Sequence, residues 1–296
     1  MNEFNRYIAV DWSGARGAVH PGIAVAACAA GAAAPELVCP GKKHWSRRAV
    51  ADFLLDQAEK SAVRGERLLA GFDFTFAPPC LDRMGYFPGW AGSPPDVAGF
   101  WRLVEDLCRD DADFYGGAVA GPPALRAYFH QQGHKGSQYE RRLRVTERAC
   151  INQGRGRAES LFHLIGPSQV GLASFAGMRL LAHLKRENPA IAIWPFEPVA
   201  ARGLTLVEIY CRLFLSHAGA ARRKIRDWEA LCRALSCFGS EPLPGAIRRM
   251  TATDHQTDAL LSAAGLRHIS GQAKYWTPQE ASANALRYEG WTFGVC

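Results

Sequence analysis

Five acidic residues stand where carboxylates could do chemistry, at or near the ends of otherwise apolar segments. They are Asp11, Asp73, Glu208, Asp254 and Asp258. Asp11 follows the run YIAV and Asp73 follows LLAGF, and both runs are typical of buried strands. A carboxylate that stays ionised beside an apolar sheet costs free energy unless a cation balances its charge. The pattern therefore indicates a place for a cation.

The residue types indicate which cation. An all-oxygen set of ligands, without paired His or Cys, suits the hard divalent ions Mg²⁺ and Mn²⁺. Asp254 and Asp258 are four residues apart in a predicted helix, so they share one face near its positive end. Two such ions can hold the attacking and leaving oxygens of a phosphodiester displacement. Taken singly, each acid has a simpler interpretation, because aspartate often closes a strand or caps a helix.

Alternating strands and helices must bring these acids together. The first part of the chain predicts three strands, a helix that begins after Ser46, and a fourth strand; their ranges are 7–10, 22–28, 36–39, 46–64 and 67–74. The last third predicts helices at 177–185, 222–239 and 251–267 and strands at 190–196 and 204–210. We expect the last of these helices to begin at Thr253 and to end near Gly265. This alternation predicts an α/β fold.

The order of these elements resembles the ribonuclease H fold, in which acids end the first and fourth strands and a late helix carries further acids. The chain is similar to predicted ribonuclease-H-like nucleases, a family related to the Holliday-junction resolvases. The matching stretches are YIAVDWSGA, LLAGFDFTFAPP, SQVGLASFAGMRLLAHL, IWPFE, VEIYCRLF and DHQTDALLSA. The resemblance implies one domain over residues 1–296, with a mixed sheet of three antiparallel strands followed by parallel strands and flanked by helices. It also implies that Asp11, Asp73 and Asp258 are metal ligands, with Asp254 or Glu208 completing the set.

A long insertion at about residues 77–170 departs from the compact core of that family. It is rich in loops, partly helical and basic, since residues 126–157 contain eight basic and two acidic residues and so carry +6 of the net charge of +7. Aromatic residues lie between the basic ones, as in segments that bind phosphates and bases together. The alternative is a solvated helical face. The candidate contacts to substrate phosphate are Arg141, Arg142, Arg144, Arg155 and Arg157.

Composition excludes several other classes. No apolar run approaches the roughly 20 residues that span a bilayer, and the N-terminus lacks the apolar core of a secretory signal, so we expect a cytoplasmic protein without membrane contact. The nine cysteines include no CxxC pair. His130 and His134 have the spacing of zinc ligands on a helix, but a glycine lies between them and a loop is favoured.

The sequence therefore predicts a divalent-metal-dependent nuclease with Mg²⁺ or Mn²⁺ as cofactor and nucleic acid as partner, in which Asp11, Asp73, Glu208 and Asp258 are catalytic. Two alternatives stay open. An actin-like or sugar-kinase-like ATPase also begins with a strand, an aspartate and a small turn, but it would need a second copy of that unit. A nucleic-acid-binding module could keep the fold without the activity.

Overall fold

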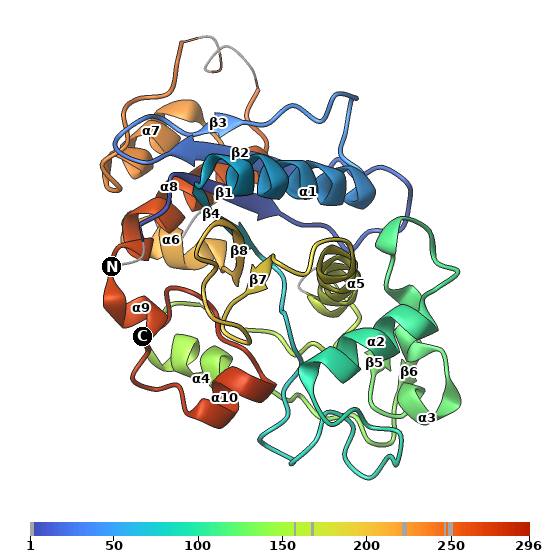
Figure 1. The fold of residues 1–296 in the computed structure, drawn as a ribbon. Coiled ribbons are helices and arrows are strands. Elements are labelled where there is room, and N and C mark those ends of the chain that lie inside the picture. The colour runs from blue at the N-terminus through green and yellow to red at the C-terminus, as the bar shows by residue number, and fades with distance from the viewer. Residues whose placement is uncertain (1–2, 157, 167–168, 221–223, 246, 248–250) are drawn as a thin grey trace.

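The computed structural model describes residues 3–156, 158–166, 169–220, 224–245, 247 and 251–296, and its centre is a mixed sheet with helices on both faces (Figure 1). The order across the sheet is β3-β2-β1-β4-β8-β7. The strands are β1 (Arg6–Asp11), β2 (Ala24–Ala29), β3 (Glu36–Leu37), β4 (Arg67–Phe72), β7 (Ala192–Ile193) and β8 (Gly203–Glu208). β1, β2 and β3 are antiparallel, whereas β1, β4, β8 and β7 run parallel. This confirms the predicted mixed sheet.

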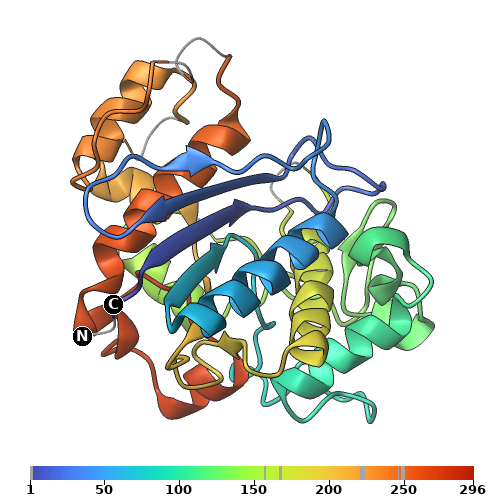
Figure 2. The same ribbon diagram turned by 45° about the horizontal axis from the view of Figure 1, so that its top comes forward.

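Helices cover both faces of the sheet. α1 (Arg47–Arg64) and α5 (Gly171–Glu187) lie together on one face, and α8 (Asp254–Ser270) crosses the other face against β1 and β2 (Figure 2). α6 (Cys211–His217) and α7 (Trp228–Ser236) pack on the outer side of α8. The sequence predicted α7 over 222–239; its first residues, 222–223, lie outside the described residues. Because the central strands are covered on both faces, they read as continuous apolar runs.

Two predicted helix starts, those at Ser46 and Thr253, are confirmed by their caps, whereas α5 begins earlier than predicted and α7 begins later. The Ser46 hydroxyl accepts a hydrogen bond from the Ala49 N–H at 3.0 Å, and Thr253 forms a capping box with Gln256 at the start of α8.

The predicted end of α8 near Gly265 is wrong, because the helix continues to Ser270. Gly265 is a site of close helix contact: a Cβ there would lie 2.3 Å from the ring of Phe214 in α6. The glycine permits this crossing and does not stop the helix.

The segment between β4 and α5 contains short elements that pack against α5 and the sheet. They are α2 (Val97–Leu107), α3 (Pro123–Arg126), α4 (Val145–Asn152), the 3₁₀ turns Ala112–Phe114 and Gly117–Ala120, and the hairpin β5 (His130–Gln131) and β6 (His134–Lys135). α2 begins after Asp96, whose carboxylate accepts a hydrogen bond from the Gly99 N–H at 2.7 Å. His130 and His134 lie on opposite strands of the hairpin, with Gly133 in the turn, so their spacing does not place them on one face of a helix. Near the C-terminus follow α9 (Ala273–Trp276) and α10 (Ala283–Tyr288).

Within the part of the chain that the structure describes, no helix has both the length and the apolar character needed to cross a bilayer.

The crossing at Gly265 gives a direct test. Gly265→Val places side-chain atoms against the Phe214 ring, and we expect the free energy of unfolding to fall by about 2 kcal/mol or more, measured by urea denaturation. Gly271→Val is the control: this helix-end glycine has φ −72° and no neighbouring atom within 4 Å of the added Cβ, so its effect should stay within about 0.5 kcal/mol. Equal losses in the two variants would contradict the close contact.

Candidate active site

Asp11 and Asp73 meet because β1 and β4 are parallel neighbours in a defined register. Val10 pairs with Phe72. The residues that follow them, Asp11 and Asp73, therefore lie next to each other at the carboxyl ends of the two strands. Side chains alternate along a strand, and Ala9 and Leu69 of the same alternation pack in the apolar cluster that contains α8. Both carboxyls therefore face α8.

α8 contributes the third carboxyl, that of Asp258, from its second turn. Asp11 and Asp258 are each only 8% exposed. Burial raises the pKa of Asp11 to about 8, and the negative charge of Asp258 adds to the effect. Burial and the neighbouring Asp11 raise the pKa of Asp73 well above its usual range, and burial also raises that of Asp258. The structure thus gathers three of the predicted acids into one interacting group, which we call the carboxylate cluster (Asp11, Asp73 and Asp258).

Hydrogen bonds hold most oxygens of the carboxylate cluster. The Trp12 N–H donates to Asp73 Oδ1 at 2.7 Å, and a hydrogen bond joins Asp73 to Asp11. His255 Nδ1 lies 2.5 Å from Asp11 Oδ2. Asp258 Oδ1 differs from these atoms, because it is buried and has no hydrogen-bond partner among the described residues. A buried carboxylate oxygen without a donor is costly, and this burial is the main reason why the pKa of Asp258 is raised.

Asp254 lies at the rim of the carboxylate cluster, where it pairs with basic side chains. Arg226 Nε is 2.8 Å from Asp254 Oδ1, and Lys224 Nζ is 3.3 Å from its Oδ2. The hydrogen bond from Arg226 is the main reason why the pKa of Asp254 is lowered. Lys224 also lies 3.9 Å from Asp258 Oδ2. Asp254 thus adds negative charge at the rim of the carboxylate cluster, and both of its oxygens are paired with basic side chains.

Glu208 is not brought to the carboxylate cluster. It pairs with Phe72 in the parallel ladder, one position before Asp73, so alternation directs its side chain away from α8. Its oxygens lie 2.5 and 2.8 Å from the Arg144 guanidinium and accept further bonds from the Phe76 N–H and the Thr292 hydroxyl at 2.8 and 2.7 Å. With its acceptors filled in the protein interior, Glu208 joins the sheet to the insertion.

The predicted phosphate-binding arginines have separate roles. Arg144, whose guanidinium also bonds to Glu147 and the Glu289 carbonyl, is buried. Arg142 is buried too, and it donates to Asp82 and to the carbonyls of residues 79, 85 and 86. Both guanidinium groups are therefore used inside the fold.

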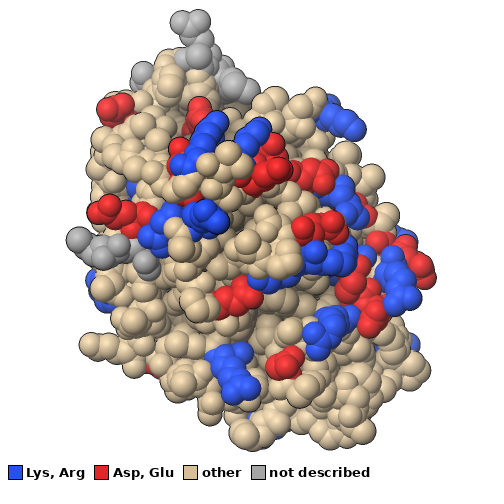
Figure 3. Space-filling view, viewed as in Figure 1, with Lys and Arg blue, Asp and Glu red and all other residues tan. Residues whose placement is uncertain are grey.

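Two of the remaining arginines are at the surface. Arg141 is exposed and pairs with Glu159, and Arg155 lies 3.0 Å from His217. Arg157 lies outside the described residues. On the face shown in Figure 3, basic and acidic side chains are intermingled rather than gathered into one basic surface.

A cleft of about 710 Å³ lies beside Asp73, at the carboxyl ends of β4 and β8. This is the position at which open α/β sheets bind ligands. Trp12, Tyr210 and the exposed Arg212 line it on the sheet side, and Arg141 lines it on the insertion side. The start of α5 forms a further wall, where the Gln169 side-chain oxygen accepts a hydrogen bond from the Leu172 N–H at 3.4 Å.

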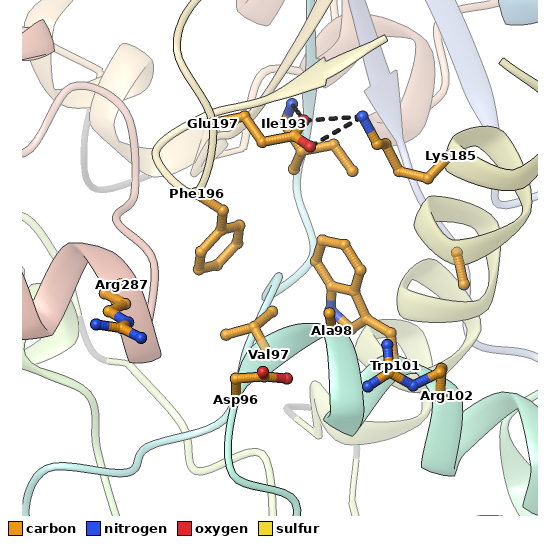
Figure 4. A pocket seen from close by; sticks show the side chains of 11 residues that line it. Asp96, Val97, Ala98, Trp101, Arg102, Lys185, Ile193, Phe196, Glu197 and Arg287 are labelled. Carbon is orange, nitrogen blue, oxygen red and sulfur yellow. Dashed lines mark hydrogen bonds and ion pairs between the residues drawn. The ribbon is translucent and has the colours of Figure 1, made fainter. Parts of the chain in front are cut away.

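A second cavity, of about 430 Å³, lies between α2, α5 and the segment after β7 (Figure 4). The Trp101 indole and the Phe196 ring meet edge to face at 5.7 Å in its wall. Lys185 points toward Glu197 and donates to it and to two carbonyls, so its charge serves this local structure. None of the five predicted acids lines this cavity.

Among the described residues, no three or more His, Cys, Asp or Glu side chains are arranged ready to hold a metal ion. The hydrogen bonds explain this: Asp73 Oδ1 is turned to the Trp12 N–H, and Asp11 Oδ2 to His255. The bond from His255 was not foreseen from sequence, where only its position beside Asp254 was visible. Comparisons of the chain with protein-family models, curated proteins and solved structures find no match, so the site is interpreted from its own geometry.

The ion pair between Arg144 and Glu208 can be tested by stability. Arg144→Leu leaves Glu208 buried without its cation, and we expect a loss of about 3–5 kcal/mol in the free energy of unfolding, measured by urea denaturation. Arg141→Leu removes an exposed pair with Glu159 and should cost less than about 1 kcal/mol. Similar small losses in both variants would show that Glu208 does not depend on Arg144.

The raised pKa of Asp11 predicts how stability changes with pH in a chelating buffer. An unfolded aspartate titrates near 3.8 and folded Asp11 at about 8, so between these values the folded chain holds more protons and stability falls as pH rises. Asp11→Asn removes this contribution. The variant should therefore lose less stability than the wild type between about pH 5 and about pH 8.

Asp254→Asn is the control, because Asp254 changes stability with pH in the opposite direction to Asp11. The pKa of Asp254 is lowered, so its stabilisation is present at neutral pH and is lost as pH falls. Thermal unfolding followed from about pH 2 to about pH 8 measures both slopes, that of Asp254 below about pH 4 and that of Asp11 above it. A steeper fall in Asp11→Asn than in the wild type would contradict the buried, protonated state of Asp11.

Proposed function

We propose that this chain is a divalent-metal-dependent nuclease of the ribonuclease-H-like type, which hydrolyses phosphodiester bonds at the carboxylate cluster. The observation that carries the proposal is the unpaired, buried Oδ1 of Asp258 beside Asp11 and Asp73. Burial raises the pKa of all three carboxyls, and the charge of Asp258 raises the pKa of Asp11 and Asp73 further, so the cluster is held together at a cost in free energy that a cation would remove. The strand order, with acids following β1 and β4, is further support.

The donor set fits Mg²⁺ or Mn²⁺, because the atoms available are carboxylate oxygens. Asp11, Asp73 and Asp258 would hold the ions, which when bound supply an activated water and stabilise charge on the phosphate. Uptake requires Asp11, whose pKa is about 8, to lose its proton and its Oδ2 to turn from His255. Metal binding should therefore release protons.

The cleft beside Asp73 would hold the nucleic-acid strand. Arg212 places a positive charge on one wall, and the start of α5 adds the partial positive charge of a helix end. Tyr210 and Trp12 provide aromatic surface next to these charges, a combination suited to a sugar–phosphate backbone and its bases. Glu208 and Arg144 would have no direct role, because they pair with each other in the floor of the cleft.

The proposal is tested by metal binding and by cleavage. In calorimetry, the wild type should bind Mn²⁺ or Mg²⁺, and Asp258→Asn and Asp11→Asn should lose this binding. With fluorescent RNA and DNA oligonucleotides, the same variants should lose about 100-fold or more in kcat/KM. Asp106→Asn, at an exposed position on α2 paired with Arg109, is the control and should keep both properties.

Two outcomes would overturn the proposal. Full metal-dependent cleavage in Asp11→Asn and Asp258→Asn would show that the carboxylate cluster is not the active site. Nucleic-acid binding without any metal uptake by the wild type would favour a binding module that has no catalytic activity.

A further inference from the structure

A second group of titratable side chains gathers far from the carboxylate cluster, around a hollow of about 270 Å³. Four segments from three separate parts of the sequence each contribute one basic residue to it. Arg155 comes from the chain after α4, His217 from the end of α6, His268 from the last turn of α8, and Lys274 from α9. We call this site the basic hollow.

The geometry of the basic hollow places these groups close together. Arg155 Nη1 lies 3.0 Å from His217 Nε2. The His268 ring lies 5.5 Å from the ring of Phe238, and Lys274 Nζ lies 4.8 Å from the centre of the Tyr275 ring. Aromatic walls thus hold two of the basic side chains at the hollow.

The positive charge of the basic hollow is not balanced by acids, because no Asp or Glu stands among the described residues that line it. Partial removal from water lowers the pKa of His217, and the charges of Arg155, His268 and Lys274 lower it further; no carboxylate acts against them. The carboxyl ends of α6 and α8 offset up to about half a charge each. Two permanent cations therefore keep an excess of positive charge here, and protonation of either histidine increases it.

The basic hollow and the carboxylate cluster are separate sites. His268 follows Asp258 by ten residues along α8, which corresponds to about 15 Å of helix. Most of α8 between them is buried under α6 and α7. A ligand in the basic hollow therefore contacts neither Asp11 nor Asp73.

We propose that the basic hollow binds a phosphate group. The Arg155 guanidinium and the Lys274 ammonium group both line the hollow and can donate to phosphate oxygens, and each such charged hydrogen bond is stronger than a neutral one. The volume lies below the usual range of about 300–1,000 Å³ for sites that enclose a whole drug-sized ligand, so the hollow suits the phosphate itself rather than a complete nucleotide. The phosphate can be a free anion or part of a nucleic-acid backbone. The proposal does not depend on nuclease activity.

The test uses the full-length protein in a chelating buffer without divalent ions. Inorganic phosphate and pyrophosphate are titrated by calorimetry and by thermal shift, and a fluorescent single-stranded oligonucleotide by anisotropy. We expect the wild type to bind at least one of these probes at millimolar concentration or below, and Lys274→Gln and Arg155→Gln each to weaken that binding about tenfold or more. Lys42→Gln, an exposed lysine elsewhere, should bind as the wild type does.

The probes distinguish the two sources of phosphate. Binding of the oligonucleotide that pyrophosphate displaces assigns the hollow to a nucleic-acid backbone, and binding of the inorganic anions alone assigns it to a free phosphate; either result supports the proposal. The proposal is overturned if the wild type binds none of the probes, or if Lys42→Gln weakens binding as much as Lys274→Gln and Arg155→Gln do. Asp258→Asn should bind phosphate as the wild type does. The nuclease proposal fails on metal binding and cleavage, and this proposal fails on phosphate binding, so the two failures can be told apart.

Discussion

The register between β1 and β4 is the constraint on which the candidate site depends. Because Val10 pairs with Phe72, the two aspartates that follow stand side by side and on the same face. A shift of one residue would turn one of them to the opposite face, where α1 and α5 pack. The side chains of both strands are buried on each face, so such a shift would force the core to repack, and the core of the fold and the position of the acids are set by the same pairing.

α8 depends on that pairing as well. Its apolar residues pack on the face of β1 and β2 from which Asp11 projects, and this contact carries Asp258 to the end of the strands. The capping box at Thr253 determines where the helix begins and therefore which turn reaches Asp11. One packing arrangement thus explains both the burial of the helix and the raised pKa values of the carboxyls.

The sequence predicted the sheet, its main helices and three of the acids because these depend on local patterns. Apolar runs that end in aspartate and a Thr-x-x-Gln cap are visible in one segment at a time. The direction and the partner of the Glu208 side chain could not be predicted, because they depend on the residue of β4 with which Glu208 pairs and on Arg144 from the insertion. Gly265 was misread for the same reason, because its role comes from a ring on another helix.

The basic insertion shows a related limit of composition. Its net charge suggested a surface for polyanions, yet two of its arginines are buried donors, and Arg155 belongs to a group with residues from the last third of the chain.

The buried pair of Arg144 with Glu208 has a mechanical consequence. Swinging the insertion away from the sheet would break this pair and leave Glu208 without its cation, which costs several kcal/mol. The pair therefore favours an insertion that is a fixed wall of the cleft and not a hinged cover, and any ligand of the cleft must fit the opening as it stands.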